Sequence, residues 1–219
     1  MKNNEKIEKH DIEALIELNK QFTKWLNKNK ATAELLKLRN KFGGTLGEAE
    51  AIVKLYKTIH RNRSNIEWRG VNKRGSDIVI KTEKKEIKIQ IKTTTDGKNV
   101  HLFVSKIKNG KTLRNKTLNS DAKNKIIEEV GRQAKGKADY WIIVDIHCNK
   151  PNFFVLTEKQ IISLLKAHEN NYHNNIKHKN KNYHNGINKN GTIMHIIKMK
   201  ELRKYKESKK RWKVMSNIS

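Results

Sequence analysis

The chain is 219 residues long and 35% hydrophobic, which is enough for one well-buried core and a small additional lobe. Its formal net charge of +27 favours a polyanionic partner, with DNA or RNA first and an anionic membrane surface second. Residues 1–20 are charged and hold no continuous apolar run, so we expect no signal peptide, no membrane span and a cytoplasmic location. Cys148 is the only cysteine, which excludes an intramolecular disulfide and a zinc site built from clustered thiolates.

Two helices are predicted at the start of the chain. Residues 11–27 carry apolar side chains at helical spacing, and Asp11 is placed to cap the first turn. A second, short helix is predicted over residues 31–41, ending at Gly43-Gly44. We expect both to pack against the rest of the protein as an N-terminal helical lobe.

A third helix is predicted from Leu46 to Ile59, with Thr45 at its start. At about 100° per residue, Glu48 lies inside the apolar arc of this helix, and Glu50 lies outside it, where Lys54 and Lys57 can pair with it. Thr45-Leu46-Gly47-Glu48 also fits a capping box, in which the glutamate accepts a hydrogen bond from the backbone N–H of the cap residue.

The most informative segment runs from residue 75 to residue 95. It follows a short predicted strand at residues 65–69 and predicts two strands joined by the polar turn 81–85. Side chains along a strand alternate between its two faces. The second strand therefore has an apolar face of Ile87, Ile89 and Ile91, and a polar face of Lys88, Gln90 and Lys92.

Asp77 opens the first of these strands, so a carboxylate, an amide and an ammonium group can converge at one end of the hairpin. Hydrolysis of a phosphodiester by a divalent metal needs this combination. The oxygens of Asp77 and Gln90 suit a hard cation such as Mg²⁺, and Lys92 suits the attacking water or the developing charge. The alternative interpretation is an edge strand whose lysines are solvated and prevent aggregation.

The pattern of Asp77 followed by Gln90-Ile91-Lys92 resembles that of the PD-(D/E)XK nucleases. In that superfamily an Asp is followed, after a strand-length gap, by Glu or Asp, any residue and Lys. Gln90 replaces the usual acid, as in the Gln-x-Lys branches, and residues 89–93 are most similar to small prokaryotic nucleases with a Gln-Val-Lys-Thr strand. The missing negative charge should weaken metal binding.

The resemblance implies that Asp77, Gln90 and the Ile91 carbonyl bind Mg²⁺, for which Mn²⁺ can substitute, and that Lys92 positions the attacking water. It also implies an additional metal ligand at Glu48, because Gly47-Glu48-Ala49 resembles the Gly-Glu segment on the preceding helix of this superfamily. Glu50 is the second candidate for that ligand. For Glu48, the metal-ligand and capping-box interpretations both stay open.

The remaining elements are predicted from strand alternation, helical periodicity and capping residues. The Asp96-Gly97 turn indicates a hairpin between the second strand of the central segment and the strand that follows. In order, we expect a strand at 99–105, a basic loop at 106–116, a helix at 121–134 capped by Ser120, a central strand at 140–146, a strand at 151–156, and a helix from the Thr157 capping box to Lys166. His101 is expected to be an exposed strand residue, and Asp145 structural rather than catalytic.

Residues 168–190 are rich in Asn, His and Lys, so they predict a long or partly disordered loop that closes over nucleic acid, with Tyr172 and Tyr183 stacking on bases. A zinc site or a His-Asn-His nuclease is the alternative there. The chain ends with a predicted strand at 192–197 and a basic helix at 200–214. That helix can bind phosphates through its cationic face, and it can also be a solvated terminal helix docked by Leu202 and Tyr205; the two interpretations are compatible.

Together these features predict an α/β fold: a restriction-endonuclease-like mixed β-sheet core flanked by helices. The expected division is an N-terminal helical lobe at residues 1–44, the nuclease-like core at 45–167 and a basic C-terminal extension at 168–219. The expected function is metal-dependent endonucleolytic cleavage of DNA phosphodiester bonds, in restriction or DNA processing. The alternative is a non-catalytic nucleic-acid-binding protein on a degenerate nuclease fold, and a membrane-surface protein is a third class. A homodimer is left open.

Overall fold

The computed structural model of the chain describes residues 33–58, 66–69, 76–82, 85–106, 120–147, 151–174, 190–204 and 212, together with residues 14, 15, 17, 18, 21, 22 and 24. Within these residues, the helices are α2 (Ala33–Thr58), α4 (Ser120–Ala134), α5 (Glu158–Asn174) and α7 (Met199–Lys204). The strands are β1 (Ile66–Trp68), β2 (Ile78–Lys81), β3 (Glu86–Thr94), β4 (Asn99–Lys106), β5 (Tyr140–Asp145), β6 (Asn152–Thr157) and β7 (Thr192–Lys198).

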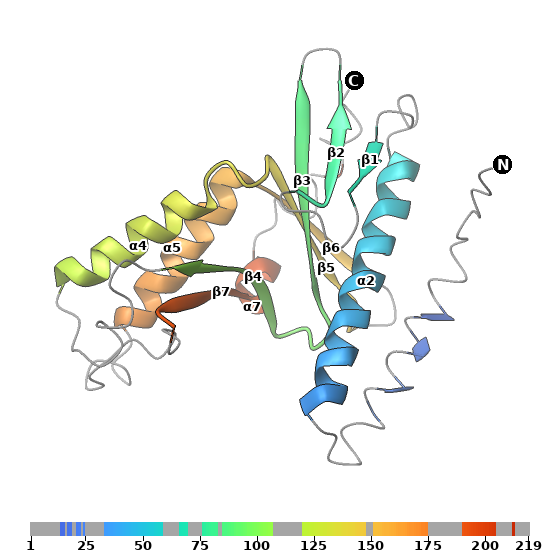
Figure 1. The fold of residues 1–219 in the computed structure, drawn as a ribbon, viewed down its shortest axis with the longest axis horizontal. Helices are drawn as coiled ribbons and strands as arrows, with labels where there is room; N and C mark the ends of the chain where they lie inside the picture. The colour runs from blue at the N-terminus through green and yellow to red at the C-terminus, as the bar shows by residue number, and fades with distance from the viewer. Residues whose placement is uncertain are drawn as a thin grey trace.

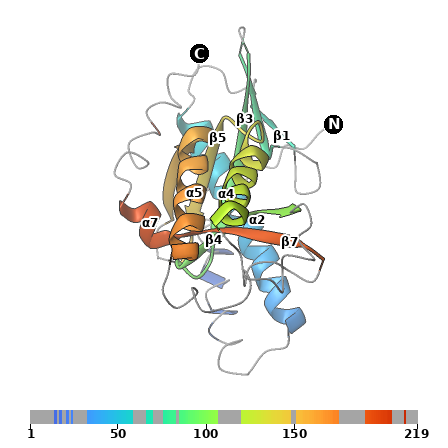
Figure 2. The same ribbon diagram turned by 90° about the vertical axis from the view of Figure 1, so that its left-hand side faces the viewer.

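A five-stranded sheet with the order β1-β2-β3-β5-β6 forms the centre of the fold, and β4 pairs with β7 in a separate two-stranded sheet. The large sheet is mixed, because β3 and β5 are parallel and its other neighbouring strands are antiparallel. Helix α2 covers one face of it, and α4, α5 and the small sheet lie on the opposite side (Figure 1). Figure 2 shows α4 and α5 side by side in front of the sheets. The predicted α/β class with a mixed sheet flanked by helices is confirmed.

Each face of the large sheet has its own apolar core. Toward α2, the buried isoleucines of β2 and β3 pack with Leu46 and Leu55 of the helix. Toward α4 and α5, Trp141 and Ile143 of β5 pack with Phe154 of β6 and with apolar residues of the helices and the small sheet. Strand β5 contributes to both cores, as predicted for a nearly all-apolar central strand.

The alternation predicted for β3 is confirmed. Ile87, Ile89 and Ile91 are buried in the core that faces α2. On the other face, Lys88 is exposed, Lys92 is half-buried and Gln90 is buried. The register pairs Ile78, the first residue of β2, with Ile89, so Ile91 lies two residues beyond the part of β3 that pairs with β2.

The prediction that a helix ends at Gly43-Gly44 is wrong, because α2 continues through both glycines from Ala33 to Thr58. The close packing of α2 on the sheet depends on a different glycine, Gly47. A Cβ atom at Gly47 would lie 2.0 Å from Oγ1 of Thr93 on β3, so only glycine lets α2 approach the strand this closely. The single helix also runs across the division expected between residues 44 and 45.

The predicted hairpin between β3 and the next strand is also wrong, since β4 pairs with β7. The Oδ1 atom of Asp96 accepts hydrogen bonds from Thr94 Oγ1 and from the backbone N–H groups of Lys98 and Asn99. Gly97 has a φ of 62°, which favours glycine. This turn directs the chain out of the large sheet, and β5 takes the edge of β3 that a hairpin partner would have occupied.

The predicted elements at β1, β2, β5, β6, α4 and β7 are confirmed within a residue or two. The capping box is confirmed as well: Thr157 N–H donates to Gln160 Oε1 at 3.0 Å, and Gln160 N–H donates to Thr157 Oγ1 at 3.4 Å. Helix α5 continues to Asn174, so a loop beginning at residue 168 is wrong. The side chains of Tyr172, Tyr183 and Tyr205, the basic loop 107–116 and Cys148 lie outside what the structure describes.

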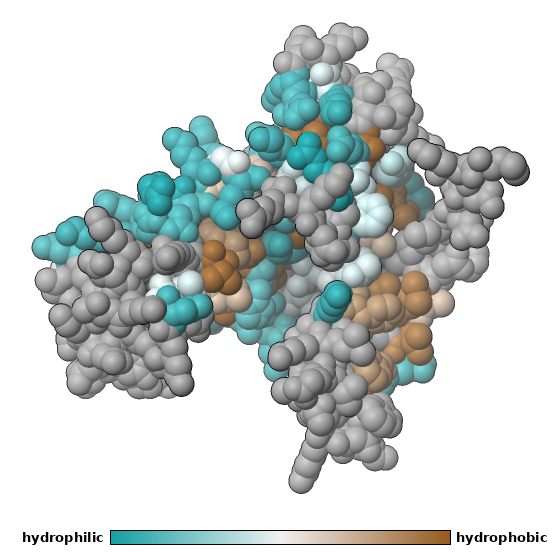
Figure 3. Space-filling view, in the orientation of Figure 1, coloured by the Kyte–Doolittle hydropathy of each residue, from teal (hydrophilic) through white to brown (hydrophobic). Residues whose placement is uncertain are grey.

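At the termini, the described residues between 14 and 24 are helical, but Leu15 is 39% exposed, so this part of the predicted apolar face is not buried. Leu202 on α7 is buried, as expected for a docked helix. Among the described helices, none combines the length and the apolar character that a membrane crossing requires. On the visible face, hydrophilic surface covers α4, whereas apolar surface lies over α2 (Figure 3).

Candidate functional site

Asp77 lies immediately before β2, beside the stretch of β3 that extends past the end of its partner strand. Its Oδ2 atom accepts a hydrogen bond from Gln90 Nε2 at 2.5 Å and another from the backbone N–H of Ile91 at 2.6 Å. The side-chain carboxylate thus occupies the position where a longer β2 would have supplied a backbone carbonyl. Asp77 and Gln90, which are 13 residues apart in the sequence, are held together by the hairpin.

The backbone of Ile91 faces the Asp77 side of the strand. The carbonyl groups of Lys88 and Thr94 accept hydrogen bonds from Asp139 and Ile146 at the two ends of β5. Backbone groups alternate along a strand, and the N–H and C=O of one residue point to the same edge. The Ile91 carbonyl therefore faces the same gap as its N–H, next to the Asp77 carboxylate.

The electrostatics of Asp77 follow from this half-buried position. Burial raises the pKa of the carboxyl group above its ordinary value. The Ile91 N–H, the nearby Lys92 ammonium and the Gln90 amide all lower the pKa, without removing the net increase. The carboxylate is thus partly compensated by donors, and a cation beside it would favour its charged form further.

Glu48 of α2 belongs to the same electrostatic group. Burial and, to a smaller extent, the negative charge of Asp77 raise its pKa, Lys92 lowers it, and the net result is a pKa of about 7. The capping-box interpretation is wrong, because Thr45 lies inside α2 and its Oγ1 donates to the Lys41 carbonyl at 3.2 Å. Glu48 is therefore a mid-helix carboxylate near a second carboxylate and an ammonium group.

Glu50 has different surroundings. It is only 9% exposed, although it lies outside the apolar arc of its helix. Burial lowers the pKa of Lys54, and the charge of Glu50 partly restores it, as predicted for this pair. The Lys54 ammonium also lies 4.5 Å from the ring centroid of Phe153. The pKa of Glu48 depends on Asp77 and Lys92, whereas Glu50 acts on the pKa of Lys54.

A cavity of about 370 Å³ opens on the polar face of β3. Gln90 and Lys92 form part of its wall, with Lys88 further along the strand. The opposite walls come from β4, β5, the turn after α4 and the residues that follow β1 and precede β2. The other residues that line the cavity are Arg69, Ser76, Leu102, Phe103, Gly136, Lys137 and Trp141.

This donor set fits a hard divalent cation. Two neighbouring carboxylates, an amide group and a backbone carbonyl supply oxygen atoms, which are the ligands that Mg²⁺ prefers. Gln90 uses its Nε2 to bind Asp77, which leaves its carbonyl oxygen as an acceptor. Among the described residues, no group of three His, Cys, Asp or Glu side chains is placed to hold a metal ion, so any such site depends on the amide and the backbone.

The other predicted residues lie elsewhere. His101 is exposed on β4, as expected. Asp145 is fully buried at the end of β5, where it contacts the His147 ring and pairs with Arg203 of α7 at 3.2 Å. Asp145 thus joins the large sheet to α7. His168 of α5 lies 3.7 Å from Glu201 of α7.

Sequence reasoning placed Lys88 on the polar face with Gln90 and Lys92, but it missed other residues around the cavity. Arg69, Lys137 and Trp141 reach the cavity only because β5 runs parallel to β3 and β4 leaves the sheet, and no local pattern signals this. Comparison with models of known protein families and with curated proteins finds no match for the chain.

Proposed function

We propose that the chain is a metal-dependent endonuclease of the PD-(D/E)XK type, with a restriction-endonuclease-like core, that hydrolyses DNA phosphodiester bonds. The observation that carries this proposal is the cluster at the open end of the hairpin. There Asp77 is hydrogen-bonded to Gln90 and to the backbone of Ile91, and the Lys92 ammonium acts on the pKa of Asp77. The residues that form the sequence pattern of this superfamily therefore lie close together in the folded chain.

The topology around the cluster also supports the proposal. A helix that carries Glu48 packs on the sheet, an antiparallel hairpin carries Asp77 and Gln90, and a parallel strand follows after a crossover through α4. The helix that precedes the hairpin brings a second carboxylate to the open end of the hairpin. This is the arrangement expected for a restriction-endonuclease-like core.

In this proposal, Asp77, Gln90, the Ile91 carbonyl and Glu48 hold Mg²⁺, for which Mn²⁺ can substitute. A cation bound there would polarise the scissile phosphate and acidify a water molecule. The Ile91 N–H and the Gln90 amide fix the rotamer of Asp77, so its second oxygen is oriented before a cation binds. Lys92 positions the attacking water or stabilises the added negative charge.

The charge distribution supports a nucleic-acid substrate. The formal net charge is +27, and four cationic side chains, Arg69, Lys88, Lys92 and Lys137, line the cavity beside the cluster. Such a surface attracts a phosphate backbone without regard to sequence. Restriction or DNA processing is the corresponding biological setting.

The second candidate is a non-catalytic nucleic-acid-binding protein on a degenerate nuclease fold. The feature that favours it is Gln90, which contributes an amide where the related enzymes usually have a carboxylate. With one negative charge fewer, the cluster attracts a divalent cation less strongly. Binding that weakens steeply with salt is expected of both candidates, so binding alone does not separate them.

Product formation separates the two. Purified protein is incubated with supercoiled plasmid, branched DNA and RNA, each with Mg²⁺ and with chelator. We expect DNA cleavage that requires the metal and is lost in Asp77→Ala and Lys92→Ala, both folded by circular dichroism. Asp121→Ala and Lys98→Ala, which change exposed residues outside the cluster, are the matched controls and should cleave normally. Salt-sensitive binding without metal-dependent products would instead support the non-catalytic candidate.

A further inference from the structure

The walls of the cavity beside the cluster contain two buried polar groups that lack a partner. Ser76 is 2% exposed and Trp141 is 1% exposed, and both line the cavity. Within the described part of the chain, the Ser76 hydroxyl and the Trp141 indole N–H have no hydrogen-bond partner. A buried donor without an acceptor is costly and rare, so the pair indicates that an acceptor from another molecule belongs here.

The cationic side chains of the lining also donate, whereas Gln90 adds a side-chain carbonyl oxygen that can accept. Lysine and arginine carry only donors, and the indole N–H of tryptophan is a donor without an acceptor. Arg69 forms one ion pair with Glu67 at 3.5 Å, which occupies only part of its five-donor guanidinium group. Lys137 lies 4.5 Å from the ring centroid of Phe103. A ligand rich in acceptors and negatively charged complements these walls.

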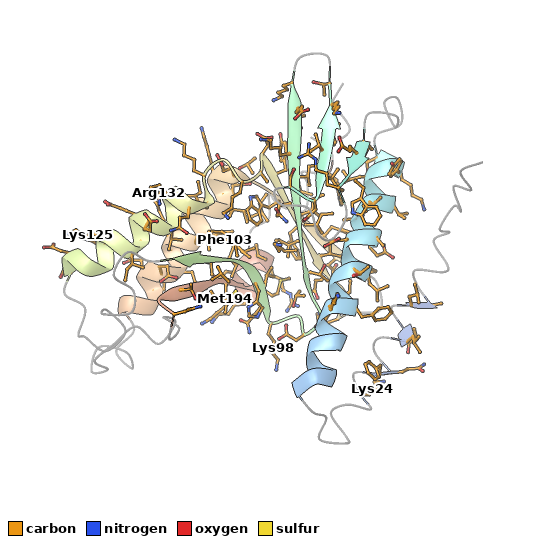
Figure 4. The ribbon with its side chains drawn as sticks, viewed as in Figure 1. Lys24, Lys98, Phe103, Lys125, Arg132 and Met194 are labelled. Atoms are coloured by element: carbon orange, nitrogen blue, oxygen red, sulfur yellow. The ribbon has the colours of Figure 1, made fainter. Side chains whose placement is uncertain are left out.

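One side of the cavity is apolar and aromatic. Phe103 of β4, labelled in Figure 4, faces Trp141 of β5 with ring centroids 6.2 Å apart. Leu102 lies beside them in the lining. A flat apolar group therefore fits next to the anion, and the volume of about 370 Å³ lies within the range typical of small-ligand sites.

We propose that this cavity is a nucleotide subsite that binds one phosphate, with its sugar and base, of the DNA strand next to the scissile position. The phosphate oxygens accept hydrogen bonds from Ser76 and Trp141 and contact Arg69, Lys88 and Lys137. The base or sugar lies against Phe103. The subsite deepens the proposed function, on which its place beside the scissile phosphate rests, but its binding chemistry requires no metal ion.

The first test is calorimetry on the full-length protein in chelator, with thymidine 5′-monophosphate, thymidine and inorganic phosphate as ligands. The monophosphate should bind most tightly and thymidine least, because the charged group makes most of the contacts. Ser76→Ala and Trp141→Phe should each weaken monophosphate binding about 10-fold, the effect of one hydrogen bond to a charged group. Ser76→Ala should not lower the melting temperature of the ligand-free protein, because the hydroxyl makes no internal hydrogen bond and its removal relieves the cost of burying it.

Lys137→Ala and Lys135→Ala form a matched pair. Both residues are exposed on the same turn and both substitutions remove one positive charge, but only Lys137 lines the cavity. Lys137→Ala should weaken monophosphate binding about 10-fold, and Lys135→Ala less than 2-fold, because the latter changes only the overall charge. Equal effects of the two substitutions, or none from Ser76→Ala, would overturn the subsite.

A second experiment tests whether the phosphate bound in the subsite belongs to a DNA strand or to a free nucleotide. Anisotropy of a labelled single-stranded oligonucleotide, again in chelator, should show weaker binding to Ser76→Ala and competition by the monophosphate. Monophosphate binding that depends on Ser76, together with oligonucleotide binding that does not, would overturn the assignment to the strand. These results do not depend on cleavage, so an inactive protein with an intact subsite would contradict only the proposed function.

Discussion

The two faces of β3 share one backbone but have different surroundings and different roles. Toward α2, the strand presents Ile87, Ile89 and Ile91 to a closed apolar core. On the other face, Gln90 and Lys92 border a cavity with a cationic lining, and Asp77 is hydrogen-bonded to Gln90 at its edge. Burial of the apolar face fixes the position of the strand. Because the strand is fixed, the polar groups on its other face stay close together although they are partly buried.

The largest expected effect comes from damaging the apolar face. Ile89 is fully buried, so Ile89→Ala should lower the free energy of unfolding by about 3 kcal/mol, through lost burial and the cavity left behind. Lys88→Ala, the adjacent substitution on the exposed face, should change it by less than about 0.5 kcal/mol. Urea unfolding measures both. Similar losses for the two would contradict the division between the faces.

Next in size is the contact between α2 and β3. Gly47→Ala places a Cβ atom 2.0 Å from Oγ1 and 2.5 Å from Cγ2 of Thr93, so the free energy of unfolding should fall by about 2 kcal/mol despite the better helix propensity of alanine. Adding Thr93→Ala removes the clashing atoms and should restore most of the loss. A double variant no more stable than Gly47→Ala, compared by thermal unfolding, would rule out this contact as the cause.

On the polar face, Gln90→Glu introduces the carboxylate that the PD-(D/E)XK pattern has at this position. A third negative charge beside Asp77 and Glu48 strengthens attraction for a divalent cation, so the Mg²⁺ concentration for half-maximal cleavage should fall about 10-fold. The substitution also replaces the amide donor to Asp77, so the metal-free protein should melt at a lower temperature. An unchanged Mg²⁺ requirement would indicate that Gln90 does not contact the metal.

The smallest effect concerns the pH dependence of stability. The pKa of Glu48 is about 7 in the folded protein, against 4.5 for the ordinary group. The unfolded chain therefore loses its proton first, and the stability contributed by the protonated carboxyl group is lost as pH rises from 4.5 through 7. Without metal, Glu48→Gln should have little effect at pH 4 and should stabilise by about 1 kcal/mol at pH 8, less than a fully buried group because Glu48 is half-buried.

Thermal unfolding in chelator at several pH values measures this difference, with Glu128→Gln on the exposed face of α4 as the control. A Glu48→Gln benefit that is the same at every pH would show that the carboxylate does not titrate in this range. Added Mg²⁺ at pH 8 should stabilise the wild-type protein more than Glu48→Gln, because the cation compensates the charge of Glu48.

Much of the fold was predictable because its signals are local. Alternation fixed the two faces of β3, continuous apolarity marked β5, and the capping box at Thr157 marked the start of α5. The same alternation placed Asp77, Gln90 and Lys92 at one end of the hairpin. These features depend on residues within one or two elements, which a sequence displays directly.

The errors arose where a long-range contact decides the structure. Gly43 and Gly44 look like a helix end, but α2 continues through them and packs on Thr93 of β3 at Gly47. The Asp96-Gly97 turn looks like a hairpin, but β7, about 100 residues later, is the partner of β4. Arg69, Lys137 and Trp141 come together around the cavity only because of this topology. The subsite therefore could not be predicted from a local sequence pattern.

The central claim is that the Asp77 cluster cleaves DNA with the help of a divalent metal. The most direct test is the rate of supercoiled plasmid cleavage by wild-type protein and by Asp77→Asn, each with Mg²⁺ and with chelator. Asp77→Asn keeps the side-chain shape but removes the charge. The account predicts metal-dependent cleavage by the wild-type protein and a loss of about 1,000-fold or more in Asp77→Asn, with the fold intact. Equal rates for the two proteins, or wild-type cleavage that persists in chelator, would contradict it.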